Sequence, residues 1–138
     1  MDFNKSFEVV ELWLLEKGYD VLLETSGEDA VYFGCNVVII NSRKHIEKRL
    51  YTLLHECGHI LINNNNSSDR VFSLSHDTDA VMGRKVSRKR RIAKLAEEIE
   101  AWKRGESLAK RLSIRIDEDK FDKMRADAIM SYVEWARD

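Results

Sequence analysis

The chain has 138 residues with a formal net charge of −1, and 34% of its residues are charged. This length suits one domain that buries roughly two-thirds of the surface of the unfolded chain, so we treat residues 1–138 as a single domain. The near balance of charge provides no overall field to recruit nucleic acid or a membrane. Because the first residues lack the pattern of an export signal and no apolar run could span a bilayer, we expect a cytoplasmic protein.

The first forty residues predict a helix followed by a small sheet. Apolar side chains recur with helical spacing in residues 6–17, and Gly18 is suited to end that helix. Three short stretches rich in β-branched and aromatic side chains predict strands at 19–24, 30–34 and 36–40. The polar residues 26–29 predict a hairpin turn between the first two strands. The unbroken apolar run 37–40 indicates a strand that is covered on both faces.

Helical patterns dominate the rest of the chain. Apolar residues at steps of three, four and one predict a helix that is capped by Ser42 and continues to Ile62. A long connection follows at 63–86, and its polar start predicts a surface loop of unassigned role. Capping residues then predict a helix over 87–112 and a last helix that begins at Asp117. We therefore predict an α+β fold in which a small three-stranded sheet packs with about four helices.

The most informative motif is His55-Glu56-Cys57-Gly58-His59, within the predicted second helix. On a helix that advances about 100° per residue, His55 and His59 lie about 40° apart, and Glu56 points about 60° from His59. The three side chains can therefore address one point. Neutral imidazoles bind Zn²⁺ well, and a nearby carboxylate that does not bind the metal can take a proton from a zinc-bound water. This is the H-E-x-x-H pattern of zinc hydrolases, which makes His55 and His59 candidate ligands and Glu56 the candidate catalytic base.

The other residues of this motif are predicted to have structural roles. Cys57 lies about 200° from His55 around the helix, so it should face the core. Together with Cys35, which falls in a predicted strand, it is expected to be a buried thiol and not part of a disulfide or a ligand pair. Gly58 costs roughly 1 kcal/mol of helix propensity relative to alanine, which indicates that another element approaches the helix closely there.

A catalytic zinc ion normally takes three protein ligands, so a third ligand must come from downstream of the histidines. The candidates lie in the long connection and on the 87–112 helix: His76, Asp77, Asp79, Glu97, Glu98 and Glu100. The apolar stripe of that helix comprises Ile92, Leu95, Ala96, Ile99, Trp102, Leu108, Ala109 and Leu112. Glu98 borders this stripe and can face a neighbouring helix, whereas Glu97 and Glu100 point further outward. Since a helix also holds ligand geometry better than a polar loop, Glu98 is the predicted third ligand.

Two segments resemble the metallopeptidase domain of the ImmA/IrrE family. The first is the strand Ile39-Ile40-Asn41-Ser42, a basic helix and Leu54-His55-Glu56-Cys57-Gly58-His59-Ile60-Leu61. The second is Glu98-Ile99-Glu100-Ala101-Trp102, where the family commonly has an asparagine in place of Trp102. The resemblance covers roughly residues 30 to 110. It implies a zincin-like minimal metallopeptidase domain, with zinc held by His55, His59 and Glu98 and with Glu56 as general base.

The activity implied by this resemblance is zinc-dependent cleavage of a protein substrate, and a transcriptional repressor is the family-level expectation. In the expected mechanism zinc acidifies a bound water, and Glu56 accepts its proton and delivers it to the leaving amine. The donor that would assist the oxyanion is unassigned, with His76, Tyr51 and Arg70 as candidates. An extended peptide could pair with an exposed edge of the sheet, for which the 36–40 strand is the candidate.

The alternative function is a binding module for nucleic acid or for an acidic protein, with a structural zinc ion. Six cations lie within eight residues around the start of the 87–112 helix: Arg84, Lys85, Arg88, Lys89, Arg90 and Arg91. Cations are unfavourable beside the positive end of a helix dipole, so a bound anion would relieve a repulsion there. No interleaved aromatic residues accompany the cations, so solvated helix charge is the competing explanation. Glu56 argues against a structural zinc ion, because a closed site has no use for that carboxylate.

Overall fold

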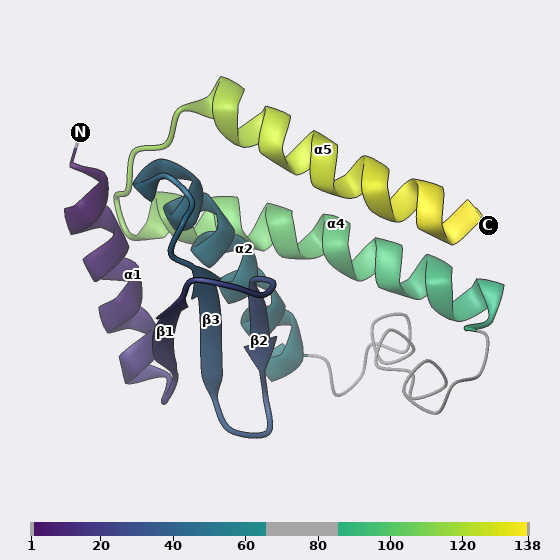
Figure 1. Ribbon diagram of the computed structural model, residues 1–138, viewed down its shortest axis with the longest axis horizontal. Helices are drawn as coiled ribbons and strands as arrows, with labels where there is room; N and C mark the ends of the chain where they lie inside the picture. Colours follow the sequence, from purple (N-terminus) through teal and green to yellow (C-terminus); the bar gives the residue numbers. More distant parts are fainter. Residues whose placement is uncertain (1, 66–85, 138) are drawn as a thin grey trace.

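The computed structural model describes residues 2–65 and 86–137, and this part of the chain forms a three-stranded mixed sheet with four helices (Figure 1). The elements in chain order are α1 (Phe3–Glu16), β1 (Asp20–Glu24), β2 (Ala30–Tyr32), β3 (Val37–Asn41), α2 (Ile46–Asn65), α4 (Arg88–Arg111) and α5 (Glu118–Arg137). The predicted α+β class, with a small sheet and about four helices, is confirmed. Within the described residues, no helix combines the length and the apolarity needed to cross a membrane.

Capping side chains set where three of the helices begin. The carboxylate of Asp2 accepts hydrogen bonds from two backbone N–H groups in the first turn of α1. Ser87 and Asp117 cap α4 and α5 in the same way, as predicted. The end of α1 is followed by Gly18, whose φ of 88° is a left-handed conformation that glycine adopts without steric cost.

The limits of α2 differ from the prediction at both ends. Ser42 does not cap the helix, because its hydroxyl donates to the carbonyl of Glu24 at the end of β1. The Nδ1 atom of His45 instead accepts a hydrogen bond from the first turn, at 3.2 Å. The helix also continues through Asn65, since the burial of Ile62 outweighs the weak helix propensity of the asparagines that follow. The rest of the predicted 63–86 loop, residues 66–85, lies outside the described residues.

β3 is the central strand of the sheet, which has the order β1-β3-β2. β1 pairs with it in parallel and β2 pairs with it in antiparallel orientation, so that Leu22 and Ala30 both lie opposite Ile39. The hairpin therefore joins β2 to β3, and the predicted hairpin turn at 26–29 between the first two strands is wrong. The prediction that the 36–40 strand is an exposed edge is also wrong, because both of its sides are paired. Its strongly apolar sequence suits the centre of the sheet.

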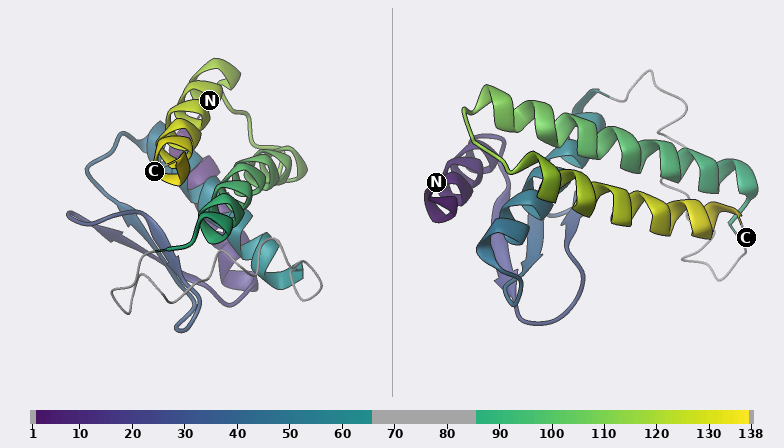
Figure 2. Two further views of the ribbon diagram at one scale, coloured as in Figure 1. Left: turned by 90° about the vertical axis from the view of Figure 1, so that its right-hand side faces the viewer. Right: turned by 90° about the horizontal axis from the view of Figure 1, so that it is seen from above.

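Among the described residues, helices cover one face of the sheet and leave the other face without a helix, as Figure 2 shows. Val38 and Ile40 are fully buried on this face, whereas Leu22, whose side chain lies on the other face, is 47% exposed. The expectation that β3 is covered on both faces is therefore wrong for the described part of the chain. Cys57 is buried as predicted, but Cys35 lies in the β2–β3 loop and is exposed, and both thiols are free.

The buried face of α4 differs from the predicted stripe in its first half. Trp102 and Leu108 are buried, as predicted, but Ile92 and Ile99 are 54% and 45% exposed. The buried positions around them include the charged residues Arg91, Glu97 and Glu98. The stripe was misplaced because this half of α4 buries charged groups that have polar partners, and apolar periodicity does not register such groups.

α2 and α4 cross in close contact at two glycines. A Cβ atom on Gly58 would lie 1.9 Å from the carbonyl oxygen of Ala101. A Cβ atom on Gly105 would lie 2.5 Å from the carbonyl oxygen of Leu54. Neither position can hold a side chain without separation of the two helices, which agrees with the close approach predicted at Gly58.

Replacement of Gly58 by alanine tests this crossing. Alanine has the higher helix propensity by roughly 1 kcal/mol, so Gly58→Ala would stabilise a helix with open space at this position. Because the methyl group would overlap the carbonyl of Ala101, we expect the free energy of unfolding to fall by about 2 kcal/mol or more. Denaturant unfolding followed by circular dichroism measures this change. Gly34→Ala is the matched control, since its Cβ would meet nothing within 4 Å. A Gly58→Ala variant as stable as the parent would contradict the close crossing.

Candidate metal centre

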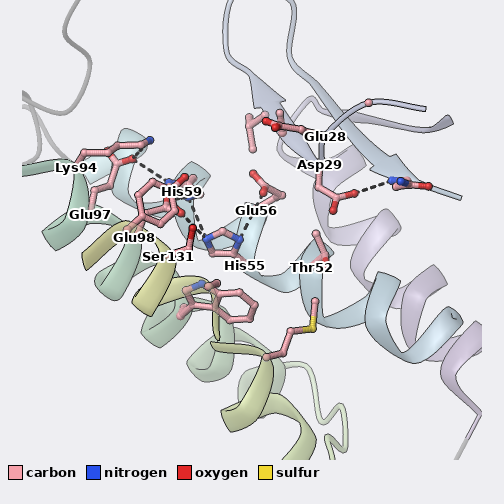
Figure 3. A pocket seen from close by; sticks show the side chains of 18 of the residues that line it. Glu28, Asp29, Thr52, His55, Glu56, His59, Lys94, Glu97, Glu98 and Ser131 are labelled. Atoms are coloured by element: carbon pink, nitrogen blue, oxygen red, sulfur yellow. Dashed lines mark hydrogen bonds and ion pairs between the residues drawn. The ribbon is translucent and has the colours of Figure 1, made fainter. Parts of the chain in front are cut away.

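Three side chains from two helices converge on one point: His55 and His59 from α2, and Glu98 from α4 (Figure 3). The Nε2 atoms of the two histidines lie 3.2 Å apart. One carboxylate oxygen of Glu98 lies 3.2 Å from Nε2 of His55, and the other lies 2.6 Å from Nε2 of His59. Ligand atoms around a tetrahedral zinc ion stand about 3.3 Å apart, so this cluster can hold a metal ion. The structure thus brings together the three residues that the sequence analysis selected as ligands.

Glu97 contacts the cluster through the ring nitrogen of His59 that does not face Glu98. The Oε2 atom of Glu97 lies 3.0 Å from Nδ1 of His59, and Glu97 is only 2% exposed. The prediction that Glu97 points outward is wrong, because the packed face of α4 includes both Glu97 and Glu98. When Nε2 of His59 has lost its proton, a carboxylate that accepts from Nδ1–H leaves the Nε2 lone pair directed at the cluster. Lys94 lies 3.5 Å from the same Glu97 oxygen, and Glu100 lies outside the cluster and pairs with Arg104.

Trp102 holds the other histidine. Its ring stacks on the imidazole of His55, with centroids 4.3 Å apart and an angle of 11° between the planes. Phe121 of α5 packs against the indole edge-on at 5.4 Å. The plane of the His55 ring is thereby fixed by core packing. The position of Trp102 on the apolar stripe predicted its burial but not this contact, because helical periodicity shows which face is buried and not which ring lies opposite.

Glu56 lies beside the cluster without belonging to it. One of its carboxylate oxygens lies 3.5 Å from Nδ1 of His55, the nitrogen that faces away from Glu98. Burial raises the pKa of Glu56, and the positive charges of His55 and His59 only partly oppose this. A raised pKa brings a carboxyl group nearer to the pH at which it can both accept and release a proton. The geometry thus separates three ligand side chains from one proton-transfer group.

The ligand residues are coupled by charge. Burial alone lowers the pKa of His59, but hydrogen bonds to Glu97 and Glu98 and the negative charge of Glu98 outweigh it and raise the pKa to about 10. Burial raises the pKa of Glu98, but its hydrogen bonds with His55 and His59 hold that pKa well below its usual range. A metal ion that binds Nε2 of His59 must therefore displace a proton.

The cluster faces a cavity of about 820 Å³ whose walls come from α2, α4, α5 and the β2 region. Asp29, just before β2, accepts a hydrogen bond from the backbone of Asn41 at 2.6 Å and pairs with Lys44. These bonds tie the β2 side of the cavity to the end of β3. The opposite wall is formed by α5, which contributes Met124, Ala128, Ser131 and Tyr132. Apolar periodicity places Met124, Ala128 and Tyr132 on one face of this helix and predicts that they belong to the core. It does not show that this face lines a cavity, because that depends on tertiary packing.

Several sequence candidates do not reach the cavity or cannot be placed. His76, Asp77, Asp79 and Arg70 lie outside the described residues. Tyr51 is buried elsewhere: its hydroxyl donates to Glu47 at 2.7 Å and accepts from the backbone of Asp117 at 2.8 Å. The suggestion that Tyr51 assists an oxyanion is therefore wrong.

One of the six cations of the predicted basic surface, Arg91, is buried in the structure. Arg91 is only 8% exposed, and its guanidinium donates to the carbonyl of Trp135 on α5. Arg88 and Lys89 are exposed, and Arg84 and Lys85 lie outside the described residues. Arg91 is thus not available to a phosphate or to an acidic partner, which weakens the prediction of a binding module.

No protein-family model matches the chain, and neither a curated protein nor a solved structure matches it. The resemblance to ImmA/IrrE metallopeptidases therefore depends on the two motifs alone.

The support from Glu97 can be tested by metal binding. Glu97→Ala removes the acceptor for Nδ1 of His59, and loss of such a contact typically lowers metal affinity by about 10- to 100-fold. Glu100→Ala is the matched control, because this carboxylate lies on the same helix but outside the cluster. Competition with a chromophoric chelator measures the affinity for Zn²⁺. Equal affinities for Zn²⁺ in the two variants would show that Glu97 does not contribute to metal binding.

The affinity for the metal should also depend on pH. Because hydrogen bonds to Glu97 and Glu98 raise the pKa of His59 to about 10, binding at neutral pH releases its proton. We expect the affinity for Zn²⁺ to rise about tenfold for each pH unit between about pH 6 and pH 8. Titration calorimetry in buffers of different ionisation enthalpy counts the released protons. An affinity that does not change with pH would show that metal binding does not release a proton from His59.

Proposed function

We propose that the protein is a zinc-dependent peptidase that hydrolyses a peptide bond in a protein substrate. The observation that carries this proposal is the convergence of His55, His59 and Glu98 beside a separate carboxylate, Glu56, in one cavity. Two imidazoles and one carboxylate are a ligand set typical of catalytic zinc, which keeps a fourth position for water or substrate. Structural zinc sites are usually closed by four ligands and rich in cysteine, whereas Cys57 faces the core here and Cys35 lies on the surface.

The chain's own groups provide the proton transfers. When bound, zinc would supply a Lewis acid that acidifies a water molecule and polarises a carbonyl group. Glu56 accepts the proton of the attacking water and delivers it to the amine that leaves, and burial raises the pKa of this carboxyl group in the direction that eases the exchange of a proton. Glu97 and Trp102 hold the two histidine rings, so the ligands need little rearrangement.

The β2 wall of the cavity can pair with an extended peptide. Ala30 and Val31 of β2 line it, and β2 is an edge of the sheet, since β3 is its only strand partner among the described residues. The unpaired backbone of β2 can bind a peptide by strand addition, which gives affinity with little demand on sequence. We therefore propose that a substrate pairs with β2 and not with the 36–40 strand. A repressor as substrate is suggested by the ImmA/IrrE resemblance, and the exposed thiol of Cys35 suits a reducing compartment such as the cytoplasm.

The substitution Glu56→Gln tests the proposed function. We expect it to retain zinc, because Glu56 is not one of the three ligands, and to lower peptide hydrolysis by at least about 100-fold. Terminal-peptide proteomics of cells that express the parent or the variant measures the loss. A new terminus that forms with the parent but not with Glu56→Gln identifies the substrate and its cleavage site.

Glu100→Gln is the matched control, since it makes the same chemical change on a carboxylate outside the cavity lining. The control should produce the same new termini as the parent. Equal turnover by the parent and Glu56→Gln would reject the proton-transfer role of Glu56. Zinc loss in Glu56→Gln would instead show that Glu56 is a ligand.

A further inference from the structure

The α5 wall of the cavity carries a phenol that the mechanism above does not use. Tyr132 lines the same cavity as His55, Glu56 and Glu98. Its helix lies alongside α4 in both views of Figure 2. The ring packs edge-on against Trp135 of the same helix, with centroids 6.1 Å apart. Hydrolysis of a peptide bond places negative charge on the carbonyl oxygen, and the mechanism assigns no protein donor to that oxygen.

The chemical state of Tyr132 suits a donor. The ordinary pKa of a tyrosine phenol is about 10, so Tyr132 carries its proton at neutral pH. The shared cavity places the Tyr132 side chain beside the ligand cluster, where a reacting carbonyl oxygen would be held.

Other donors line the cavity but are less suited. The Thr52 hydroxyl and the Trp102 indole N–H are completely shielded from solvent and have no partner within the described residues. A peptide carbonyl could reach them only if α2 or α4 moved. Lys94 is held by Glu97 at 3.5 Å. Tyr132 is half-buried, so its side chain is accessible to a ligand in the cavity.

We propose that Tyr132 is a further catalytic residue whose hydroxyl donates a hydrogen bond to the carbonyl oxygen of the cleaved peptide bond as that oxygen becomes negative. This inference rests on the proposed peptidase function. The phenol keeps its proton throughout: the proton from water passes to Glu56 and then to the leaving amine, and Tyr132 only stabilises the charged oxygen. One such donor typically contributes about 100-fold to kcat.

The test compares Tyr132→Phe with the parent, both loaded with zinc. Two probes report on the donor: N-phosphoryl-leucyl-alanine, whose tetrahedral anionic group resembles the charged oxygen, and N-acetyl-leucyl-alanine, which has a neutral planar carbonyl. We expect Tyr132→Phe to bind the phosphoryl probe about 100-fold more weakly and the acetyl probe equally well. Zinc affinity should stay within about threefold, and kcat on a peptide library should fall about 100-fold with little change in KM. Tyr19→Phe is the matched control, because it removes a hydroxyl from a tyrosine outside this cavity.

Each other outcome overturns the assignment in a distinct way. Unchanged affinity for the phosphoryl probe in Tyr132→Phe would exclude the donor role and leave the peptidase proposal intact. A loss of zinc affinity as large as the loss of kcat would make Tyr132 a positioning residue for Glu98. A parent that binds the phosphoryl probe no better than the acetyl probe would also exclude the donor. A parent that cleaves no peptide in the library would refute the proposed function, while the two binding measurements would still decide the role of the phenol.

Discussion

The approach of α4 to α2 at two glycines is the contact on which the centre depends. Gly58 directly precedes His59 on α2, and the Ala101 carbonyl that it meets lies one helical turn from Glu98 on α4. A side chain at Gly58 would push the helices apart, and the 2.6 Å contact between Glu98 and His59 could not persist. Close-packed interiors transmit such displacements and do not absorb them. The centre is therefore a property of the helix interface, although two of its ligands come from one motif.

The residues of the centre that lie on one helix motif could be predicted from the sequence. The residues on α4 show where helical periodicity fails as a guide to burial. His55, Glu56 and His59 were predictable because a single helix fixes their relative directions. Glu98 was predictable because it borders the Trp102 side of α4. Glu97 was assigned to the solvent by the same argument, yet it is buried because His59 and Lys94 compensate its charge. A hydrophobic pattern treats every carboxylate as exposed, so it cannot identify a buried ion pair.

The sheet shows a related limit. Neighbouring strands in a sequence usually pair, which led to a hairpin between β1 and β2, but β3 lies between them. The position of β3 is decided by burial and not by strand order along the chain. The most apolar strand lies at the centre of the sheet, where Val38 and Ile40 are fully buried. The cavity walls depend on the same nonlocal packing. β2 reaches the cavity because it is displaced to the edge, and Tyr132 reaches it because α5 folds back along α4.

The three buried carboxylates around the two imidazoles affect how stable the protein is in a cell. Glu56, Glu97 and Glu98 are at most 6% exposed, and such shielded anions weaken a fold unless cations accompany them. An ion bound only by the native chain, present at a thousand times its dissociation constant, would stabilise it by about 4 kcal/mol. That is a large share of the few kcal/mol that keep a domain folded. Metal starvation would therefore increase the unfolded fraction that cellular proteases degrade, so that abundance would follow the supply of the ion.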